Sequence, residues 1–236
     1  MIPILKIPHD AEGIFKKRKN RFLGIVDIEK PFLEKDVPVH IHDSGRLPDL
    51  LYPGNKVALE IKNTKSRKTK WDIIKAKDKN FWILTNSSYH NKIAASLIEK
   101  EIFKDIKKPL CIKQEPKIGK DRLDLLVKIG ETEYWIEVKG CTLEKNNIAL
   151  FPDAPTQRGR KHLRVLMELK DRGIRNAIIF LVFRPTSNCF MPNKEVDPIF
   201  SSLLYNSLKK GISIYPVLLF LKDEYIYYKK ILKLCK

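Results

Sequence analysis

The sequence has few cysteines and no long apolar run. Its four cysteines are scattered, with no Cys-x-x-Cys pair and no histidine at metal-ligand spacing, which argues against structural zinc. The most apolar runs, AIIFLVF and YPVLLFLK, are far shorter than the roughly 20 residues that a membrane span needs. The amino-terminal MIPILKIPHD is too interrupted by proline and lysine to form the apolar core of a signal peptide. We therefore expect a cytoplasmic protein with reduced thiols and no membrane partner.

The chain also lacks a Gly-rich phosphate loop of the Walker or dinucleotide type, an internal repeat and a low-complexity segment. An enzyme acting on a phosphorylated small molecule therefore has no support from the sequence. Hydrophobic residues make up 43% of the chain and charged residues 31%, which is the composition of an ordinary folded protein. A length of 236 residues allows one large domain or two small ones, and we favour two.

Acidic residues are clearly outnumbered. The 46 lysines and arginines exceed the 28 aspartates and glutamates, and the formal net charge at pH 7 is +18. Both halves of the chain are basic, so each can attract a polyanion. Background composition or a solubility effect is the alternative explanation, because no single block of like charge dominates. We interpret the charge as favouring nucleic acid as the partner.

Two patterns divide the chain. Residues 13–84 alternate apolar and polar positions in the runs RFLGIVDI, VPVHIHD, KVALEIKN, KWDIIKAK and FWILTN, which are typical of strands. Five short strands with basic loops favour a small closed barrel of the oligonucleotide-binding type. Later residues predict a helix at about 91–105, capped by Ser87 or Ser88, and helices at about 156–172 and 197–210 between strands. We predict a barrel over residues 1–86 and an α/β domain with a mixed central sheet over residues 87–236.

The strand-like segment YWIEVKG places an acid and a base at alternate positions. Alternate side chains of a strand share a face, so Glu137 and Lys139 lie together. Asp124 belongs to the preceding strand. A two-residue turn at Glu131 and Thr132 would place Asp124 opposite Lys139, whereas a four-residue loop would place it opposite Glu137. Either register collects all three side chains on one face.

Such a cluster can carry hydrolytic chemistry. Asp124 and Glu137 are predicted ligands for Mg²⁺ or Mn²⁺, which prefer oxygen. Lys139 is predicted to hold or deprotonate the attacking water and to offset charge on a phosphate. The alternative is an exposed salt bridge on an ordinary hairpin, worth about 0 to 1 kcal/mol. Asp124 favours the site, because an unpaired carboxylate inside the apolar run LDLLV is costly, and Glu115 and Lys117 lie one strand earlier.

Basic residues are candidates for nucleic-acid contact in both domains. The segment PTQRGRKHLRVL begins a helix that Thr156 can cap, and its first turns carry cations, which the helix dipole disfavours unless an anion such as phosphate binds. A solvated basic face is the alternative, and His162 is expected to pack or to form a hydrogen bond. In the barrel we expect Phe22 and Trp71 to fill the core. The predicted nucleic-acid-binding residues are Arg18, Arg21, Arg67, Lys68, Lys70, Arg158, Arg160 and Lys161.

Three segments resemble the sugar fermentation stimulation protein family: EPKIGKDRLDLLV, WIEVKGCTLEKNNIALFPDAPTQRGRKHLRVLMELK and FMPNKEVDPIF. The blocks RFLGIVDI, HDSGRLPDLLYPGNKVAL and RKTKWDII fit the same pattern, so the resemblance covers nearly the whole chain. Its most specific block is FPDAPTQRGRKHL. The resemblance implies an oligonucleotide-binding barrel followed by a domain of the PD-(D/E)XK nuclease fold, nucleic-acid binding, and a link to the regulation of sugar utilisation.

The resemblance also assigns residues. The first acid of the nuclease motif matches Asp124, the E-x-K pair matches Glu137 and Lys139, and a further acid on the first helix falls at Glu99 or Glu101. The chain departs from the family where HDSG replaces the usual P-N-T-G, where Gly140 replaces an Asn, and where Asp121 replaces a Ser. None of these changes removes a predicted metal ligand. The possible accessory residues are Glu99, Glu115, Lys117, Arg122 and Thr156.

These observations predict a nuclease that uses Mg²⁺ or Mn²⁺ to hydrolyse phosphodiester bonds, with DNA favoured over RNA as its partner. The alternative is a non-catalytic DNA-binding regulator of sugar utilisation genes, in which the acidic cluster is structural. Both predict binding that weakens with salt, so metal affinity and cleavage separate them.

Overall fold

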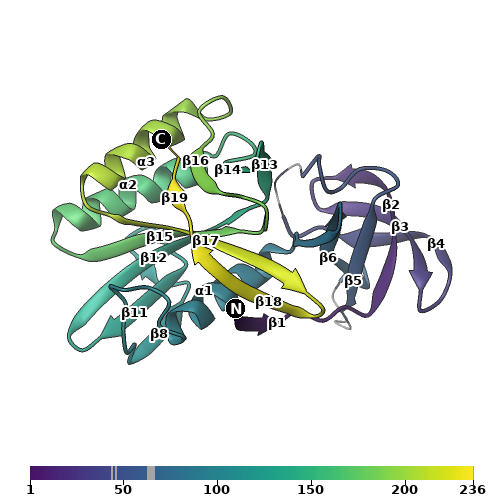
Figure 1. The fold of residues 1–236 in the computed structure, drawn as a ribbon, viewed down its shortest axis with the longest axis horizontal. Helices are drawn as coiled ribbons and strands as arrows, with labels where there is room; N and C mark the ends of the chain where they lie inside the picture. The colour runs from purple at the N-terminus through teal and green to yellow at the C-terminus, as the bar shows by residue number, and fades with distance from the viewer. Residues whose placement is uncertain (44, 46, 63–66, 236) are drawn as a thin grey trace.

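The computed structural model describes residues 1–43, 45, 47–62 and 67–235, and it contains two domains that lie next to each other (Figure 1). Ser44 of the HDSG loop and residues 63–66 of the NTKSRKTK stretch lie outside the described residues. Strands from the first part of the chain form one domain, and a larger sheet with helices on both faces forms the other.

The first domain is a closed barrel. Its sheet has the order β4-β3-β2-β5-β6-β7, and a parallel pairing of β4 with β6 at Val39 and Trp71 closes it. Buried side chains alternate with more exposed ones along β2, as a barrel wall with one inner face requires. The predicted barrel is confirmed. Its strands are β2 (Ala11–Asn20), β3 (Leu23–Lys30), β4 (Glu34–His40), β5 (Lys56–Ile61), β6 (Trp71–Asp78) and β7 (Phe81–Leu84).

Strand β2 was missed by the sequence analysis. Its second half is the basic run KKRKN, which has no apolar alternation, and its first half contains Gly13. The backbone of β3 approaches this glycine so closely that a Cβ atom would lie 2.4 Å from the carbonyl oxygen of Asp27. A glycine at a close approach of two strands looks like a turn signal in the sequence alone.

The second domain is built on a seven-stranded mixed sheet with the order β1-β18-β17-β15-β12-β11-β8. Strands β12, β15 and β17 run parallel, and the outer pairs are antiparallel. This arrangement confirms the predicted α/β class. The strands are β1 (Ile2–Lys6), β8 (Cys111–Gln114), β11 (Leu125–Ile129), β12 (Thr132–Cys141), β15 (Arg175–Val182), β17 (Ser213–Lys222) and β18 (Tyr225–Ile231).

The first strand of the chain does not belong to the barrel. Strand β1 pairs antiparallel with β18 at the edge of the large sheet, where Ile2 lies opposite Tyr228 and Lys6 opposite Tyr225. The expected barrel range of residues 1–86 therefore includes a strand of the other domain.

Helices cover both faces of the large sheet (Figure 1). Helix α1 (His90–Glu99) packs on one face in a hydrophobic core that is continuous with the barrel interior. Helices α2 (Gln157–Asp171) and α3 (Pro198–Lys209) pack on the other face in a second core. Thr156 caps α2 and Asp197 caps α3, and Gly173, with a φ of +76°, follows α2. The bounds of both helices match the predicted ones.

Helix α1 differs from its prediction at both ends. A short 3₁₀ turn, η1 (Ser87–Tyr89), precedes it, and the Asn86 side chain caps this turn by accepting a hydrogen bond from the backbone N–H of Ser88. Helix α1 itself starts after Tyr89 without a side-chain cap, so the predicted serine cap is wrong. The helix ends at Glu99 and not near residue 105, because Glu101 has a φ of +54° that no α-helix allows. Ile102 continues the apolar spacing without continuing the helix.

A small hairpin and a four-stranded sheet extend the α/β domain. Strands β9 (Lys117–Ile118) and β10 (Asp121–Arg122) form a small hairpin before β11. A four-stranded sheet has the order β13-β14-β16-β19, with β13 (Leu143–Lys145), β14 (Ile148–Phe151), β16 (Cys189–Pro192) and β19 (Lys233–Leu234). Within the described ranges, no helix has the length and apolar character to cross a membrane.

Pairing of β16 with β19 brings two cysteines together. Cys189 and Cys235 form a disulfide with their Cα atoms 5.3 Å apart, whereas Cys111 and Cys141 are free. The expectation of reduced thiols is therefore wrong for this pair. The two cysteines are 46 positions apart, and only the sheet pairing reveals that they meet.

Candidate active site

The β11–β12 hairpin places the acids of the candidate site. Ile129 pairs with Thr132 across a two-residue turn at Gly130 and Glu131, and Leu125 pairs with Ile136. Asp124, one residue before β11, therefore lies beside Glu137. Of the two registers that the sequence left open, the structure has the one that places Asp124 opposite Glu137. A two-residue turn produces it, and not the four-residue loop expected for this register. Gly130 has a φ of +56°, which a tight hairpin turn requires.

Glu137 is the most buried charged residue of the cluster. Its side chain is 1% exposed and forms an ion pair with Lys139 and a hydrogen bond with His162, both through Oε1. The other carboxylate oxygen, Oε2, is buried without a hydrogen-bond partner. Burial alone would raise the pKa of Glu137, but Lys139 and His162 outweigh it and hold the pKa below its ordinary value. Glu137 is therefore an ionised carboxylate with one unused oxygen.

Asp124 is held by the neighbouring strand. The backbone N–H of Val138 donates a hydrogen bond of 2.7 Å to its Oδ2 atom. Burial and the charge of Glu137 raise the pKa of Asp124 to about 6, despite the opposing effect of Lys139. Two carboxylates this close repel each other, and a cation between them would remove the repulsion.

His162 on α2 completes the surroundings of Glu137. Its Nδ1 atom contacts Glu137, and its Nε2 atom lies 3.5 Å from Nε of Arg158, which can only donate. Nε2 therefore accepts, and Nδ1 carries the proton that is shared with Glu137. Sequence analysis expected a packing or hydrogen-bonding role for His162 but not this partner. The sequence did hold one signal for a buried His162, because it follows Gly159 by three positions on the buried face of α2.

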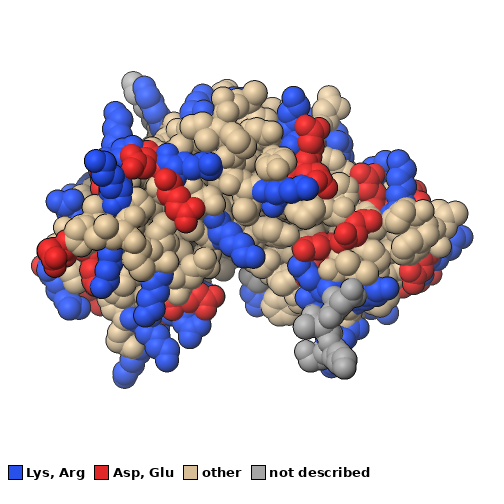
Figure 2. Space-filling view, turned by 90° about the horizontal axis from the view of Figure 1, so that it is seen from below, with Lys and Arg blue, Asp and Glu red and all other residues tan. Residues whose placement is uncertain are grey.

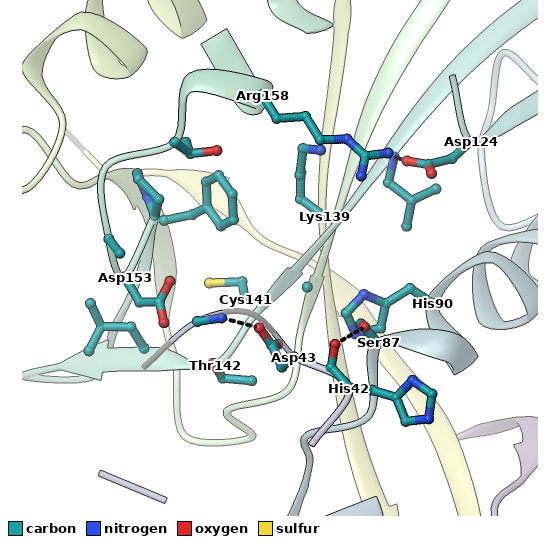
Figure 3. A pocket seen from close by; sticks show the side chains of 18 of the residues that line it. His42, Asp43, Ser87, His90, Asp124, Lys139, Cys141, Thr142, Asp153 and Arg158 are labelled. Atoms are coloured by element: carbon teal, nitrogen blue, oxygen red, sulfur yellow. Dashed lines mark hydrogen bonds between the residues drawn. The ribbon is translucent and has the colours of Figure 1, made fainter. Parts of the chain in front are cut away.

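The cluster opens into a cleft between the two domains. The cleft has a volume of about 1190 Å³, and Asp124 and Lys139 line it together with residues of the barrel (Figure 3). His42 and Asp43 come from the segment after β4, and His90 comes from the start of α1. The ring of His90 occupies the space that a Cβ on Gly140 would fill, because that atom would lie 2.2 Å from His90 Cε1. Gly140, which stands where the family usually has Asn, therefore leaves room for the His90 ring.

The predicted basic residues of α2 have different roles. Arg158 lines the cleft, and Figure 3 shows its side chain extending into it from α2. Arg160 also lines the cleft, but it forms an ion pair with the fully buried Asp197 at 3.0 Å. Lys161 forms an ion pair with Asp121 and is not among the residues of the cleft wall. Of these three, the structure therefore leaves Arg158 best placed for a phosphate.

The predicted basic residues of the barrel also differ in their surroundings. Arg21 is exposed and lines the cleft. Arg18 donates hydrogen bonds to the backbone carbonyls of Arg21, Asp43 and Gly45, so it supports the cleft wall. Arg67 forms an ion pair with the buried Asp72. Lys68 and Lys70 are exposed away from the cleft wall.

The accessory residues lie mostly at the margin. Glu115 lines the cleft and pairs with Arg122 at 2.9 Å, and both side chains are more than half exposed. Thr156 lines the cleft and caps α2. Glu99 and Lys117 are exposed and do not line the cleft, and Glu101 forms an ion pair with Lys107. The structure thus places neither Glu99 nor Glu101 near the acids.

Of the two aromatic residues expected in the barrel core, only one is there. Trp71 is 4% exposed and packs in the core. Phe22 is 46% exposed and lines the cleft, so its assignment to the core is wrong. The residue lies in the β2–β3 turn, between the paired residues Asn20 and Leu23, and not in a strand of the barrel wall.

Charge on the surface is distributed over both domains. Figure 2 shows lysine and arginine side chains interspersed with acidic ones on the face it presents, without one dominant patch. Among the described residues, no group of three or more His, Cys, Asp or Glu side chains is arranged to hold a metal ion. The acids that could bind one are therefore a pair, Asp124 and Glu137, and most of the ligands of a bound ion would be water and substrate oxygens.

Comparison with known proteins identifies the chain. Residues 17–85 match the family model described as the SfsA N-terminal OB domain, and residues 88–225 match the sugar fermentation stimulation protein RE domain. A sugar fermentation stimulation protein homolog of Methanococcoides burtonii is 40% identical, over 98% of this chain and 95% of that protein. A homolog of Thermosipho melanesiensis is 41% identical, over 99% and 98%.

A solved structure is similar throughout. The Pyrococcus furiosus SfsA structure, determined in complex with Ca²⁺, matches with a TM-score of 0.91 and 28% identity over 100% of both chains. The family resemblance read from the sequence motifs is confirmed, together with the barrel followed by an α/β domain with a mixed sheet. The chain belongs to the sugar fermentation stimulation protein family.

Proposed function

We propose that this protein is a metal-dependent nuclease that hydrolyses phosphodiester bonds in the cleft between its domains. The observation that carries the proposal is the buried Glu137, which has an Oε2 atom without a hydrogen-bond partner and lies beside Asp124 and Lys139. A structural salt bridge would have no need of a second, repelling carboxylate with a pKa raised to about 6. A cation held between Asp124 and Glu137 accounts for both features.

The residues present fit a divalent cation with oxygen ligands. Glu137 Oε2 lacks a hydrogen-bond partner, and the Oδ2 atom of Asp124 accepts a hydrogen bond from the backbone N–H of Val138. The relative from Pyrococcus furiosus, similar along its whole length, was determined in complex with Ca²⁺, an ion with the same preference for oxygen. When bound, Mg²⁺ or Mn²⁺ would supply Lewis acidity toward a phosphate oxygen and lower the pKa of a coordinated water.

The chain's own residues supply the other parts of the reaction. Lys139, 15% exposed and paired with Glu137, can hold the attacking water by hydrogen bonding and offset the charge that develops on the phosphate. Arg158 reaches the same cleft from α2 and can bind a neighbouring phosphate. His162 fixes the orientation of Glu137 through Nδ1. The acids, the lysine and the arginine therefore have separate roles.

The cleft favours a polymer over a small molecule. Its volume of about 1190 Å³ exceeds the roughly 300 to 1,000 Å³ of typical small-ligand sites, and both domains line it. A net charge of +18 favours a polyanion. DNA is the first substrate to test, with RNA beside it, and the proposed location is the cytoplasm.

The test uses labelled single- and double-stranded DNA and RNA at low salt, with Mg²⁺, Mn²⁺, Ca²⁺ or EDTA. Parent protein is compared with Asp124→Ala, Glu137→Ala and Lys139→Ala, and Glu99→Ala is the matched control because Glu99 is an exposed acid outside the cleft. We expect cleavage with Mg²⁺ or Mn²⁺ that is retained in the control and falls at least a hundredfold in the three site variants. Binding in EDTA should persist in all of them.

Intact substrates under every condition, with all variants folded and binding like the parent, would reject catalysis. The protein would then be a non-catalytic nucleic-acid-binding regulator. Equal cleavage by the site variants and the parent would also reject the proposal, since it would indicate a contaminating nuclease.

A further inference from the structure

The tip of the β2–β3 turn projects into the same cleft as the candidate active site. Asn20 pairs with Leu23, so Arg21 and Phe22 are the two central residues of a tight turn. Both line the cleft with Asp124 and Lys139. Phe22 is 46% exposed, although burying a phenylalanine side chain would stabilise the fold. An exposed aromatic ring on a cleft wall therefore requires an explanation.

The backbone of Phe22 is fixed on both sides. Its N–H donates a hydrogen bond of 2.9 Å to the side chain of Asn20, and its carbonyl accepts one of 3.0 Å from the N–H of Ile41. The preceding carbonyl, of Arg21, accepts a hydrogen bond of 2.7 Å from Arg18. The ring is thus presented by a rigid turn, and little conformational entropy remains to be lost when a ligand binds.

The ring itself is already part of a stack. His40 lies beneath it, with ring centroids 6.2 Å apart and planes inclined by 21°. His42 contacts His40 edge-on at 4.5 Å. Burial and the neighbouring His42 lower the pKa of His40, so His40 is a neutral ring at neutral pH and suits an aromatic stack. The guanidinium carbon of Arg21 lies 5.4 Å from the Phe22 centroid.

We propose that Phe22 is a stacking platform for an unpaired base, and that Arg21 binds the phosphate next to it, so that the substrate is single-stranded nucleic acid. This inference rests on the proposed nucleic-acid substrate and names its class. A planar base can extend the existing stack, and the exposed Arg21 side chain can move from the ring to a phosphate. Bases inside a duplex have both faces covered by their neighbours, so only an unpaired base can use the ring.

The position of the platform also relates binding to chemistry. The barrel supplies Phe22 and Arg21, while the α/β domain supplies Asp124, Lys139 and Arg158 to the same cleft. A strand whose base stacks on Phe22 would continue along the cleft toward the two acids. The platform would then fix which phosphodiester reaches them.

The test measures binding by the full-length protein in EDTA, so cleavage does not enter. The probe is a labelled single strand of roughly 12 nucleotides, within the range that one such barrel covers, and a duplex of the same sequence. The variants are Phe22→Ala and Phe22→Trp. Phe32→Ala is the matched control, because Phe32 is also 46% exposed but does not line the cleft.

We expect Phe22→Ala to weaken single-strand binding roughly tenfold, Phe22→Trp to retain it and Phe32→Ala to leave it unchanged. The affinity for the duplex should change by less than about twofold in all three variants, since the duplex would be bound only through the charge of its phosphates. Thermal unfolding of each variant checks that the exposed turn tolerates the change.

A second measurement locates the base. One abasic position is moved along the single strand, and we expect one placement to weaken binding to the parent protein but not to Phe22→Ala, because both changes remove the same contact. The proposal is overturned if Phe22→Ala and Phe32→Ala behave alike, or if duplex binding falls by the same factor as single-strand binding. The outcome is independent of cleavage: a confirmed platform without nuclease activity would indicate a single-strand-binding protein.

Discussion

Asp124 has an energetic cost that a bound cation would relieve. Its pKa in the folded protein is about 6, against an ordinary value of 3.8. Below pH 3.8 the carboxyl is protonated in both the folded and the unfolded chain, so there is no cost. Between pH 3.8 and 6 the unfolded chain ionises first, and above pH 6 the cost is complete, at about 3 kcal/mol. The folded state is therefore progressively destabilised as the pH rises through this window.

We accordingly expect Asp124→Asn to be more stable than the parent in EDTA at pH 8, with the difference disappearing near pH 4. Mn²⁺ should raise the melting temperature of the parent and have much less effect on the variant. Thermal unfolding at several pH values, with and without the ion, measures both. Glu99→Gln, at an exposed acid, serves as the control. An equal response of parent and variant to Mn²⁺ would contradict the assignment of Asp124 as a ligand.

At the scale of single residues, the sequence was enough to group those site residues whose positions follow from strand periodicity. Glu137 and Lys139 share a face because they are two positions apart, and Asp124 joins them once the hairpin forms. His162 contacts Glu137 from a different element 25 residues away, and no local pattern encodes that contact. Phe22 was misplaced because an aromatic in an alternating strand pattern usually faces the core, whereas the turn directs this one to the cleft.

At the scale of elements, Asp197 connects the starts of α2 and α3. Its side chain is fully buried and accepts backbone hydrogen bonds from Phe200 at 2.8 Å and from Thr156 at 2.9 Å. Arg160 adds an ion pair. Burial would raise the pKa of Asp197, but these donors outweigh it and lower the pKa. One carboxylate thus caps one helix and fixes the other against it.

We expect Asp197→Ala to destabilise the protein by about 3 to 5 kcal/mol, since it leaves a partly buried arginine and two N–H groups without partners. The stability that Asp197 gives the parent is fully present above pH 3.8 and is lost as the pH falls through the lowered pKa. The stabilities of parent and variant should therefore converge in acid. Chemical denaturation at pH 7 and below pH 3 measures this. Asp171→Ala should change stability by less than about 1 kcal/mol, because its ion pair with Lys210 is exposed.

The helices whose bounds were predicted well carry start and stop residues in the sequence at their ends. Helices α2 and α3 each begin at a capping side chain and end near a glycine. The end of α1 was overestimated because Ile102 continues the apolar spacing into an irregular segment that packs on the core. Strand β2 was missed because closure of the barrel, and not its own alternation, makes its basic half a strand.

At the scale of the whole molecule, Arg184 joins the two domains. The residue is 5% exposed, forms an ion pair with Asp78 of β6 and donates to the carbonyl oxygen of Thr142. Asp49, from the barrel segment before β5, lies 3.9 Å from its guanidinium group. Arg184 thus links β6 and the segment before β5 in the barrel to Thr142, which lines the cleft.

We expect Arg184→Ala to lower stability by about 2 kcal/mol and to loosen the domain contact, since charged hydrogen bonds across the interface are lost. Small-angle scattering should show a larger radius of gyration, and affinity for nucleic acid should fall although no cleft residue has changed. Arg122→Ala, at an exposed pair within one domain, should alter neither quantity. Unchanged scattering by Arg184→Ala would show that the shared hydrophobic core alone holds the domains together.

The place of β1 at the edge of the large sheet has a consequence for biosynthesis. Residues Ile2–Lys6 are synthesised long before their partner strand, Tyr225–Ile231. The barrel strands between them can pair as they emerge, because their partners are close in sequence. The edge of the large sheet cannot form until β18 has been synthesised. During synthesis, the nascent chain would therefore hold a finished barrel before the domain with the acidic pair is complete.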